Sequence, residues 1–184
     1  MALTHDFFTQ APVDCARKLI GCAFYHEQVG GIIVETEAYL AEGDEACHTF
    51  FKPSARAFVD QHPAGTGYVY LNYGMYWLVN VLIKGPQGHG FVLLRALDPR
   101  VGVEAMRERR GKERLTDLCS GPGKLSVALA IDGTHHGIPL TDHFRRNSND
   151  LQVKASPRIG ISRARSYPWR FMAAGNAHVS SHRR

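Results

Sequence analysis

Residues 31–39, Gly-Ile-Ile-Val-Glu-Thr-Glu-Ala-Tyr, form the stretch that most constrains how this chain can fold. Its β-branched apolar residues favour an extended strand, in which successive side chains point to opposite faces. Glu35 and Glu37 therefore share one face, and Thr36 lies on the other. Two such carboxylates either lie in solvent on an edge strand or line a site where one acts as a base. Spacing alone favours the solvated strand, because surface carboxylates far outnumber catalytic ones.

A second informative stretch, residues 68–80, reads Tyr-Val-Tyr-Leu-Asn-Tyr-Gly-Met-Tyr-Trp-Leu-Val-Asn. Tyr68 and Tyr70 share a strand face, where aromatic residues usually serve packing. Tyr73 differs, because it falls in the turn predicted at residues 72–74, between the two strands of a hairpin. An aromatic residue at a hairpin tip either folds back over its own hairpin or wedges between stacked bases. The residues alone fit both interpretations equally.

Arg95 lies inside the apolar run Val-Leu-Leu-Arg-Ala-Leu of residues 92–97. A charge in a buried strand is costly unless it is paired, so the guanidinium should face a carboxylate, a carbonyl or a cleft. Structural pairing is the commoner outcome. The unusual placement still makes Arg95 a candidate site residue.

The composition is that of a folded globular protein with an excess of positive charge. The 184 residues are 44% hydrophobic and 21% charged, and they carry a formal net charge of +5. This length suits one domain whose core needs neither disulfides nor a metal. The charge suits a polyanionic partner such as nucleic acid, although many basic proteins never bind one.

Cysteine usage and the N-terminal residues favour a cytoplasmic protein. The four cysteines, Cys15, Cys22, Cys47 and Cys119, form no CxxC pair, as expected of reduced thiols. The first eight residues lack the basic region and the long apolar core of a signal peptide. No apolar run approaches the length that spans a bilayer, so we expect no membrane contact.

Periodicity and turn signals predict an α+β fold. Helices are expected at residues 12–20, 101–110 and 123–131. Strands are expected at 22–25, 32–39, 67–71, 75–83, 91–97, 151–154, 158–162 and 170–173, with turns at Gly30-Gly31 and at 85–88. Residues 41–66 are expected to be irregular with at most short helices, and such segments are often functional. We expect a single domain over residues 1–184, with a curved, mostly antiparallel sheet and helices outside it.

No metal site is predicted, and phosphate contacts are expected in two places. His48 beside Cys47, together with His62, fits no zinc spacing. Residues 121–124, Gly-Pro-Gly-Lys, lack the full pattern of a phosphate loop, yet a helix N-terminus there can hold a backbone phosphate. The candidate phosphate contacts in the C-terminal part are Arg158, Arg163, Arg165 and Arg170.

Seven motifs, in order along the chain, resemble those of the alkyladenine (3-methyladenine) DNA glycosylase family. They are Val34–Leu40, Asp44–His48, Tyr68–Tyr76, Val92–Leu97, Leu118–Leu125, Arg158–Ile161 and Pro168–Phe171. Each is weak alone, but the ordered set covers nearly the whole chain and is highly specific. Spacing alone favours a solvated strand for Glu35 and Glu37, whereas the resemblance implies that they belong to a site.

The resemblance implies a monofunctional enzyme without metal or organic cofactor. Such an enzyme flips a damaged purine nucleotide out of double-stranded DNA and hydrolyses its N-glycosidic bond, leaving an abasic site. The implied lesions are alkylated or deaminated purines: 3-methyladenine, 7-methylguanine, hypoxanthine and ethenoadenine. A monomer suffices for one flipped nucleotide, and the DNA partner implies association with the nucleoid. The fold it implies has a β-hairpin protruding from a basic, concave DNA face.

The same resemblance assigns roles position by position. Glu37 matches the general base, Arg95 helps to hold the attacking water, and the backbone carbonyl of Ile159 is a further ligand of that water. Glu35, on the same face as Glu37, is a supporting residue. Residues that enclose or select the flipped base are Tyr39, His48, Tyr70 and Asn80, the last rejecting the exocyclic amine of guanine. Tyr73 fills the space left in the base stack, and further DNA contacts are expected from Met75, Lys124 and Arg158.

Two other functions stay open at this stage. A catalytically silent nucleic-acid-binding protein of the same fold would keep Tyr73 but lack a competent Glu37–Arg95 pair, and both residues of the pair are present. A hydrolase of free nucleosides or RNA would have no base stack for Tyr73 to fill. Residues 54–56, Ser-Ala-Arg, stand where Thr-Pro-Arg is usual in the family, and residues 57–65 and Asn72 are also atypical. These differences bear on loop contacts and lesion preference.

Overall fold

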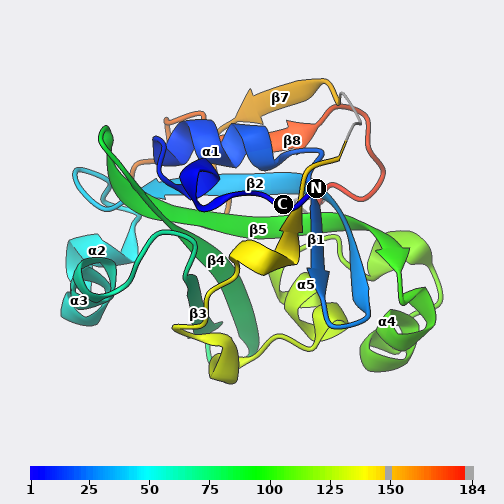
Figure 1. Cartoon of the computed structure of the whole chain (residues 1–184). Helices are drawn as coiled ribbons and strands as arrows, with labels where there is room; N and C mark the ends of the chain where they lie inside the picture. The colour runs from blue at the N-terminus through cyan, green and yellow to red at the C-terminus, as the bar shows by residue number, and fades with distance from the viewer. Residues whose placement is uncertain (148–150, 181–184) are drawn as a thin grey trace.

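A computed structural model describes residues 1–147 and 151–180 of the chain. Its centre is an eight-stranded antiparallel sheet in the order β3-β4-β5-β2-β1-β6, with β7 and β8 attached alongside β2 (Figure 1). The strands are β1 (Ala23–His26), β2 (Val29–Leu40), β3 (Gly67–Asn72), β4 (Tyr76–Gly85), β5 (Gly88–Val101), β6 (Phe144–Arg145), β7 (Val153–Ser156) and β8 (Arg170–Ala173). The predicted α+β class with a mostly antiparallel sheet is confirmed.

Helices lie outside this sheet, as expected. The α-helices are α1 (Pro12–Leu19), α2 (His48–Phe51), α3 (Pro53–Gln61), α4 (Val103–Arg110) and α5 (Pro122–Leu129). The described residues also include short 3-10 helices: η1 (His5–Phe8), η2 (Leu115–Asp117), η3 (Gly133–His135) and η4 (Thr141–His143). Within the described residues, no helix is long and apolar enough to pass through a bilayer.

Strand β2 lies between β5 on one side and, on the other, β1 at its start and β8 further along. The turn between β1 and β2 lies at residues 27–28, so the turn predicted at Gly30-Gly31 is wrong. Both glycines belong to β2, where neighbouring backbone comes very close. A Cβ atom at Gly31 would lie 2.1 Å from the carbonyl oxygen of Asp98, and one at Gly30 would lie 2.4 Å from that of Phe24. Glycine is needed there for close packing of strands.

The pairing of β2 with β5 is irregular where the charged residues lie. The register shifts twice between Ile33 and Thr36, so that Arg95 on β5 has no partner directly opposite. Bulges of this kind redirect a side chain and are frequent beside active sites. Glu35 and Glu37 nevertheless remain on one side of the strand, since both contact Arg95. Thr36 points the other way and donates a hydrogen bond of 2.8 Å to the carbonyl oxygen of Ala16 in α1.

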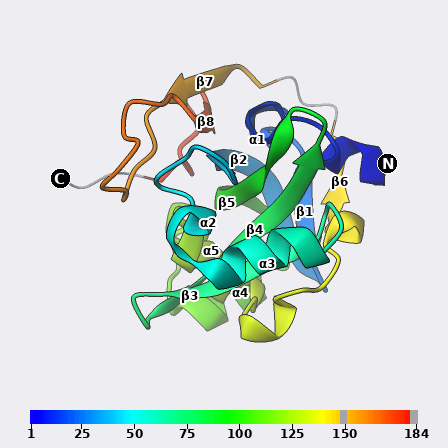
Figure 2. The same cartoon turned by 90° about the vertical axis from the view of Figure 1, so that its left-hand side faces the viewer.

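The two faces of the sheet pack against different helices. In Figure 1, α1 lies along β2, and the main apolar core fills the space between them and extends to α5. A smaller apolar cluster lies on the other face, where Phe58 and Val59 of α3 pack against Tyr68, Leu82 and Phe91. Helices α2 and α3, side by side in Figure 2, therefore cover the end of this second face.

The hairpin of β3 and β4 matches the predicted turn at residues 72–74. Figure 2 shows this turn projecting beyond α3 at the lower left. Tyr73 is 84% exposed and has a positive φ of 49°, a conformation that is uncommon for a residue other than glycine. Its side chain therefore does not fold back over the hairpin.

Several predicted boundaries are wrong for identifiable reasons. Residues 158–162 form no strand, because Pro157 supplies no N–H and Gly160 adopts a positive φ of 75°. Helix α4 begins only at Val103, since residues up to Val101 continue β5. The two-residue strand β6 was not expected, because a segment this short carries no periodic signal.

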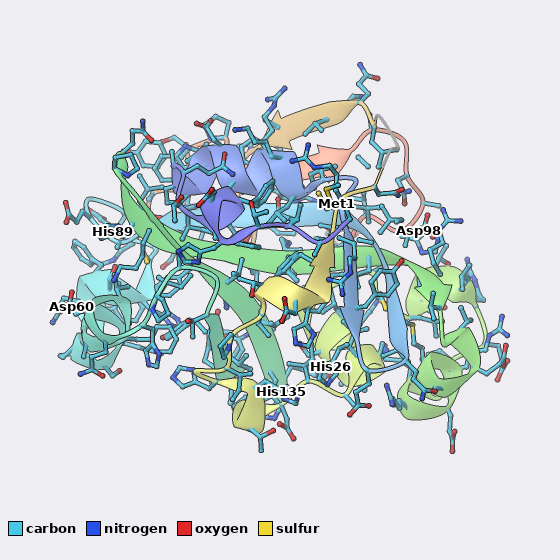
Figure 3. The ribbon with its side chains drawn as sticks, viewed as in Figure 1. Met1, His26, Asp60, His89, Asp98 and His135 are labelled. Atoms are coloured by element: carbon cyan, nitrogen blue, oxygen red, sulfur yellow. The ribbon has the colours of Figure 1, made fainter. Side chains whose placement is uncertain are left out.

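Two histidines meet at the lower edge of the sheet in Figure 3. His26 of β1 and His135 of η3 approach with their Nε2 atoms 3.2 Å apart. Burial lowers the pKa of His26, and the neighbouring His135 and His143 lower it further. The neutral form of the His26 ring is therefore favoured, and one of the two Nε2 atoms donates to the other.

We expect Phe24→Ala to lower the free energy of unfolding by about 3–5 kcal/mol, as for other buried phenylalanines. The Phe24 ring is fully buried in β1, with its centroid 4.8 Å from that of Phe144 and 5.8 Å from that of His143. Urea unfolding would measure the loss. Phe50→Ala is the matched control, because that ring is 48% exposed and its removal should change stability by about 0.5 kcal/mol or less. Equal losses in both variants would contradict the proposed core position of Phe24.

Candidate active site

A cavity of about 660 Å³ opens on the sheet face next to α2, within the size range of small-molecule sites. Its walls come from β2, β3, β4 and β5, from α2, from the start of α5 and from residues 159–163. Seven residues selected from the sequence line it: Tyr39, His48, Tyr70, Tyr73, Asn80, Arg95 and Ile159. Segments that are far apart in the chain therefore meet where the sequence predicts a site.

Glu37 lies just behind this wall and is fully buried. Its Oε2 accepts hydrogen bonds from the hydroxyl of Tyr39 at 2.7 Å and from Nη1 of Arg95 at 3.3 Å. Its Oε1 accepts a hydrogen bond of 2.9 Å from the backbone N–H of Ile159. All three donors belong to residues that line the cavity, so the carboxylate is fixed against the cavity by its own neighbours.

Arg95 connects Glu37 to Glu35. Its Nε donates to Oε1 of Glu35 at 3.0 Å, while Nη1 reaches Glu37. Burial alone would lower the pKa of Arg95, but the charges of Glu37 and Glu35 outweigh this effect and raise the pKa. The pairing predicted for a charge in this apolar strand is thus present, and the guanidinium also lines the cavity.

Glu35 is the most fully bonded carboxylate of the group. Besides Arg95, its Oε1 accepts hydrogen bonds from Nε of Arg170 at 2.7 Å and from the hydroxyl of Ser180 at 2.8 Å. Its Oε2 accepts one from the backbone N–H of Ser180 at 2.7 Å. Burial would raise the pKa of Glu35, but Arg95, Arg170 and Ser180 together hold it below the usual value. Glu35 is therefore charged at neutral pH.

Arg158 differs from the prediction that it contacts DNA. Its side chain is fully buried, as is that of Asp44, with which it forms a two-pronged ion pair of 2.6 and 2.8 Å. The guanidinium also lies 4.6 Å from the ring centre of Tyr39 and 5.0 Å from that of Trp169. No part of it is left to face a phosphate. It instead ties residues 158–164 to β2 and so places the N–H of Ile159 on Glu37.

The part of the cavity wall formed by His48, Tyr68 and Tyr70 is aromatic and uncharged. Nδ1 of His48 lies 2.9 Å from the hydroxyl of Tyr68, and its ring centre lies 4.3 Å from that of Tyr70. Burial, assisted by the charge of Lys52, lowers the pKa of His48 to about 4, and burial raises the pKa of Tyr68 to about 12. Tyr68 was interpreted only as packing, although its position two residues before Tyr70 already places both on one face.

Asn80 lies deep in the cavity and is nearly buried. Its amide nitrogen donates a hydrogen bond of 3.1 Å to the backbone carbonyl of Tyr68 on the neighbouring strand. This bond fixes the orientation of the amide against the cavity.

Among the other residues predicted to contact nucleic acid, Arg170, like Arg158, is paired with a carboxylate, whereas Tyr73, Met75 and Lys124 line the cavity or directly adjoin residues that do. Tyr73 and Met75 are exposed at the hairpin tip, and Pro122 and Gly123 of α5 line the opening. Lys124, next to them, is exposed and lies with Nζ 3.3 Å from the hydroxyl of Ser120. Among the described residues, no cluster of three or more potential metal ligands is found.

Three residues that matter to the site had no role in the sequence analysis: Asp44, Phe51 and Ser180. Asp44 lies in a motif of the resemblance, yet nothing in its spacing indicates the partner Arg158. Phe51 lines the cavity from α2, and Ser180 reaches Glu35 from a segment without any periodic pattern. Such contacts over long chain distances leave no local signal.

Acidification should destabilise the protein through His48. The pKa of its ring is about 4 in the folded protein and about 6.5 in the unfolded chain, so the unfolded chain binds more protons between these values. The associated stability is complete above about pH 6.5 and is lost as the pH falls towards 4. We expect His48→Gln to lose less stability than the unaltered protein between about pH 7 and about pH 5, measured as urea midpoints. His5→Gln, at an exposed position, should behave like the unaltered protein; equal behaviour of both variants would contradict the assignment.

Comparison with known proteins places the chain in a family. Residues 6–177 match the family model described as methylpurine-DNA glycosylase (MPG). A protein of one strain of Rhodopseudomonas palustris is 44% identical over 181 residues, covering 97% of this chain and 90% of the relative. Relatives in Agrobacterium fabrum and Rhizobium meliloti are each 44% identical, over 178 and 179 residues, covering 95% of this chain and 90% and 94% of the relatives. All three bear the provisional name 3-methyladenine DNA glycosylase.

The family match spans nearly the whole chain and includes every element that lines the cavity. The sequence-based prediction of the family and of a DNA glycosylase is thereby confirmed, and DNA is the substrate that the family implies. This chain belongs to the methylpurine-DNA glycosylase family.

Proposed function

We propose that the protein removes alkylated purines, with 3-methyladenine among them, from double-stranded DNA by hydrolysing the N-glycosidic bond with water activated by Glu37. The observation that carries this proposal is the position of the Glu37 carboxylate. It is held by Tyr39, Arg95 and Ile159 directly behind an aromatic cavity. The names of the relatives, all 3-methyladenine DNA glycosylases, support the substrate.

Counting hydrogen bonds supports Glu37 as the base. An ionised carboxylate has about four acceptor positions, and three are used by neighbouring donors. One acceptor position therefore has no protein donor, and we propose it for the attacking water. Arg95 and the backbone carbonyl of Ile159 are the further ligands that we propose for this water. Burial of the carboxylate keeps bulk water away, which strengthens its interaction with the reacting groups.

The aromatic wall suits a purine that carries positive charge. Alkylation at a ring nitrogen makes the base cationic and a good leaving group, and a cation is attracted to the face of an aromatic ring. Tyr70 and His48 offer such faces within the cavity, and one face of Tyr39 already carries the guanidinium of Arg158. We propose that Asn80, held by its bond to Tyr68, rejects the exocyclic amine of normal guanine. Neutral lesions such as hypoxanthine and ethenoadenine are also proposed substrates, and they require a proton as they leave.

Access to a base in duplex DNA requires base flipping, which costs a few kcal/mol. We propose that Tyr73 enters the stack as the nucleotide leaves it. Its exposure at the tip of a projecting hairpin, next to the cavity mouth, supports this role. Met75 and Lys124 flank the same opening and are the proposed contacts with the DNA backbone and minor groove. The proposed unit is a monomer with a single glycosylase domain over the whole chain, acting at the nucleoid.

Glu37→Gln should lower single-turnover release of 3-methyladenine-type bases by about 10²–10⁴-fold, the usual contribution of a general base. The assay follows free base liberated from a duplex oligonucleotide, and it separates chemistry from binding because lesion affinity should be retained. Glu104→Gln is the matched control, since Glu104 is exposed and pairs with Arg107 on α4. Release by Glu37→Gln at the normal rate would show that another group is the base. Tight lesion binding without release by the unaltered protein would favour a silent binder instead.

Lys124→Ala should weaken DNA binding to a similar degree for every sequence. Losing one phosphate contact reduces the slope of log affinity against log salt by about 1, because fewer counterions are released. Fluorescence anisotropy at several salt concentrations measures this slope. Lys112→Ala, which removes an exposed lysine just after α4, is the control and should leave the slope unchanged. An unchanged slope for Lys124→Ala would remove that residue from the DNA contacts.

A further inference from the structure

Four charged side chains are buried together beside the cavity, and their charges cancel. Glu35 and Glu37 are fully buried, Arg95 is nearly so, and the side chain of Arg170 is 12% exposed. Arg95 bonds both carboxylates, while Arg170 bonds Glu35 at 2.7 Å. Two positive and two negative charges therefore form one connected group. Arg95 itself lines the cavity, and Glu37 contacts the cavity-lining residues Tyr39 and Ile159.

Neighbouring groups add no net charge to this cluster. Arg158 and Asp44 form a separate buried pair that balances itself. Burial raises the pKa of Tyr39, and the negative charge of Glu37 raises it further, so the phenol is neutral. Ser180 contributes two hydrogen bonds to Glu35 and no charge. Within residues 1–147 and 151–180, Glu35 is thus the carboxylate that offsets the second arginine.

We propose that Glu35 acts as an electrostatic positioning residue: it neutralises the arginine charge so that the site accepts a positively charged purine or sugar. This inference rests on the proposed function, because it assigns the kind of charge that the cavity must hold. Glu35 is separated from the cavity, since of its partners only Arg95 lines the cavity, and Arg170 and Ser180 do not. It acts through Arg95, whose charge it shares with Glu37.

Removing the charge of Glu35 would leave the group with one uncompensated positive charge. Arg95 would then bond more strongly to Glu37 and would repel a cation in the cavity. At an effective dielectric constant of about 20, a unit charge roughly 10 Å away changes an equilibrium by about tenfold. Removing Arg170 instead would leave one uncompensated negative charge, which favours a cation. The two changes should therefore act in opposite directions.

The test compares two duplex oligonucleotides that differ at one nucleotide and that cannot be hydrolysed. One carries a pyrrolidine abasic nucleotide, whose ring nitrogen is protonated near neutral pH, and the other carries neutral tetrahydrofuran. The quantity measured is the ratio of the two affinities, which cancels losses common to both duplexes. We expect Glu35→Gln to lower the preference for the cation about tenfold and Arg170→Gln to raise it by a similar factor. Glu104→Gln removes the same charge from the exposed pair on α4 and should leave the ratio unchanged.

An unchanged ratio in Glu35→Gln or Arg170→Gln, or a shift in the same direction in both, would overturn the inference. A merely structural role would weaken binding of both duplexes and leave the ratio constant. If Glu35→Gln does not fold, the affinity ratio of Arg170→Gln alone tests the inference. Only an electrostatic role predicts that this variant binds the pyrrolidine duplex with increased preference. Base release by the unaltered protein from alkylated duplex is measured in parallel. Absence of release would refute the proposed function, while the affinity ratios would still report on the charge balance.

Discussion

Arg95 joins β2 and β5, the two strands that carry the candidate catalytic residues. It lies on β5, where the pairing with β2 shifts register, and it bonds Glu35 and Glu37 of β2 at the same time. A regular ladder would place another residue opposite it and send the guanidinium in a different direction. The irregularity therefore determines where the positive charge lies. The two carboxylates, the cavity wall and the C-terminal segment around Ser180 are arranged about that charge.

Burying this ionic group is unfavourable unless nearly every donor and acceptor finds a partner. Glu35 meets this condition with four donors, two of which come from Ser180. Glu37 has three donors, and each belongs to a residue that lines the cavity. Of the partners of Glu35, only Arg95 lines the cavity. The two chemically identical side chains, separated by one residue, thus differ in their connection to the cavity, which supports Glu37 rather than Glu35 as the proposed base.

Local sequence was informative wherever a local rule determines the structure. Alternation along β2 put Glu35 and Glu37 on one face, and turn chemistry put Tyr73 at a hairpin tip, both of which hold in the structure. The turn predicted at Gly30 and Gly31 is wrong, because glycine occurs in closely packed strands as well as in turns. Only the close approach of the Asp98 backbone shows that Gly31 serves strand packing. The aromatic and polar residues around the cavity came from the family resemblance rather than from periodicity.

Long-range pairing explains what the sequence did not predict. An arginine such as Arg158 is a typical phosphate contact. Its guanidinium is instead buried, because it pairs with Asp44, more than a hundred residues earlier in the chain. A charge pattern along the chain reports how many arginines there are but not which are already paired. The same holds for Ser180, whose partner Glu35 lies 145 positions away. Such partners are identified only once the sheet has brought both segments together.

Burial gives most of the cavity wall a neutral charge state. It raises the pKa of Tyr39, Tyr68 and Tyr70 and lowers that of His48, so these side chains are uncharged at neutral pH. Among buried groups, the charge that a cationic purine would meet then comes from Glu37 and Arg95, and through Arg95 from Glu35. A neutral, buried wall screens these charges little. A small change in the net charge of the ionic group therefore acts strongly on a bound cation and weakly on a neutral base. Selection between charged and neutral lesions is therefore expected to depend on the ionic group behind the wall as well as on the aromatic residues that touch the base.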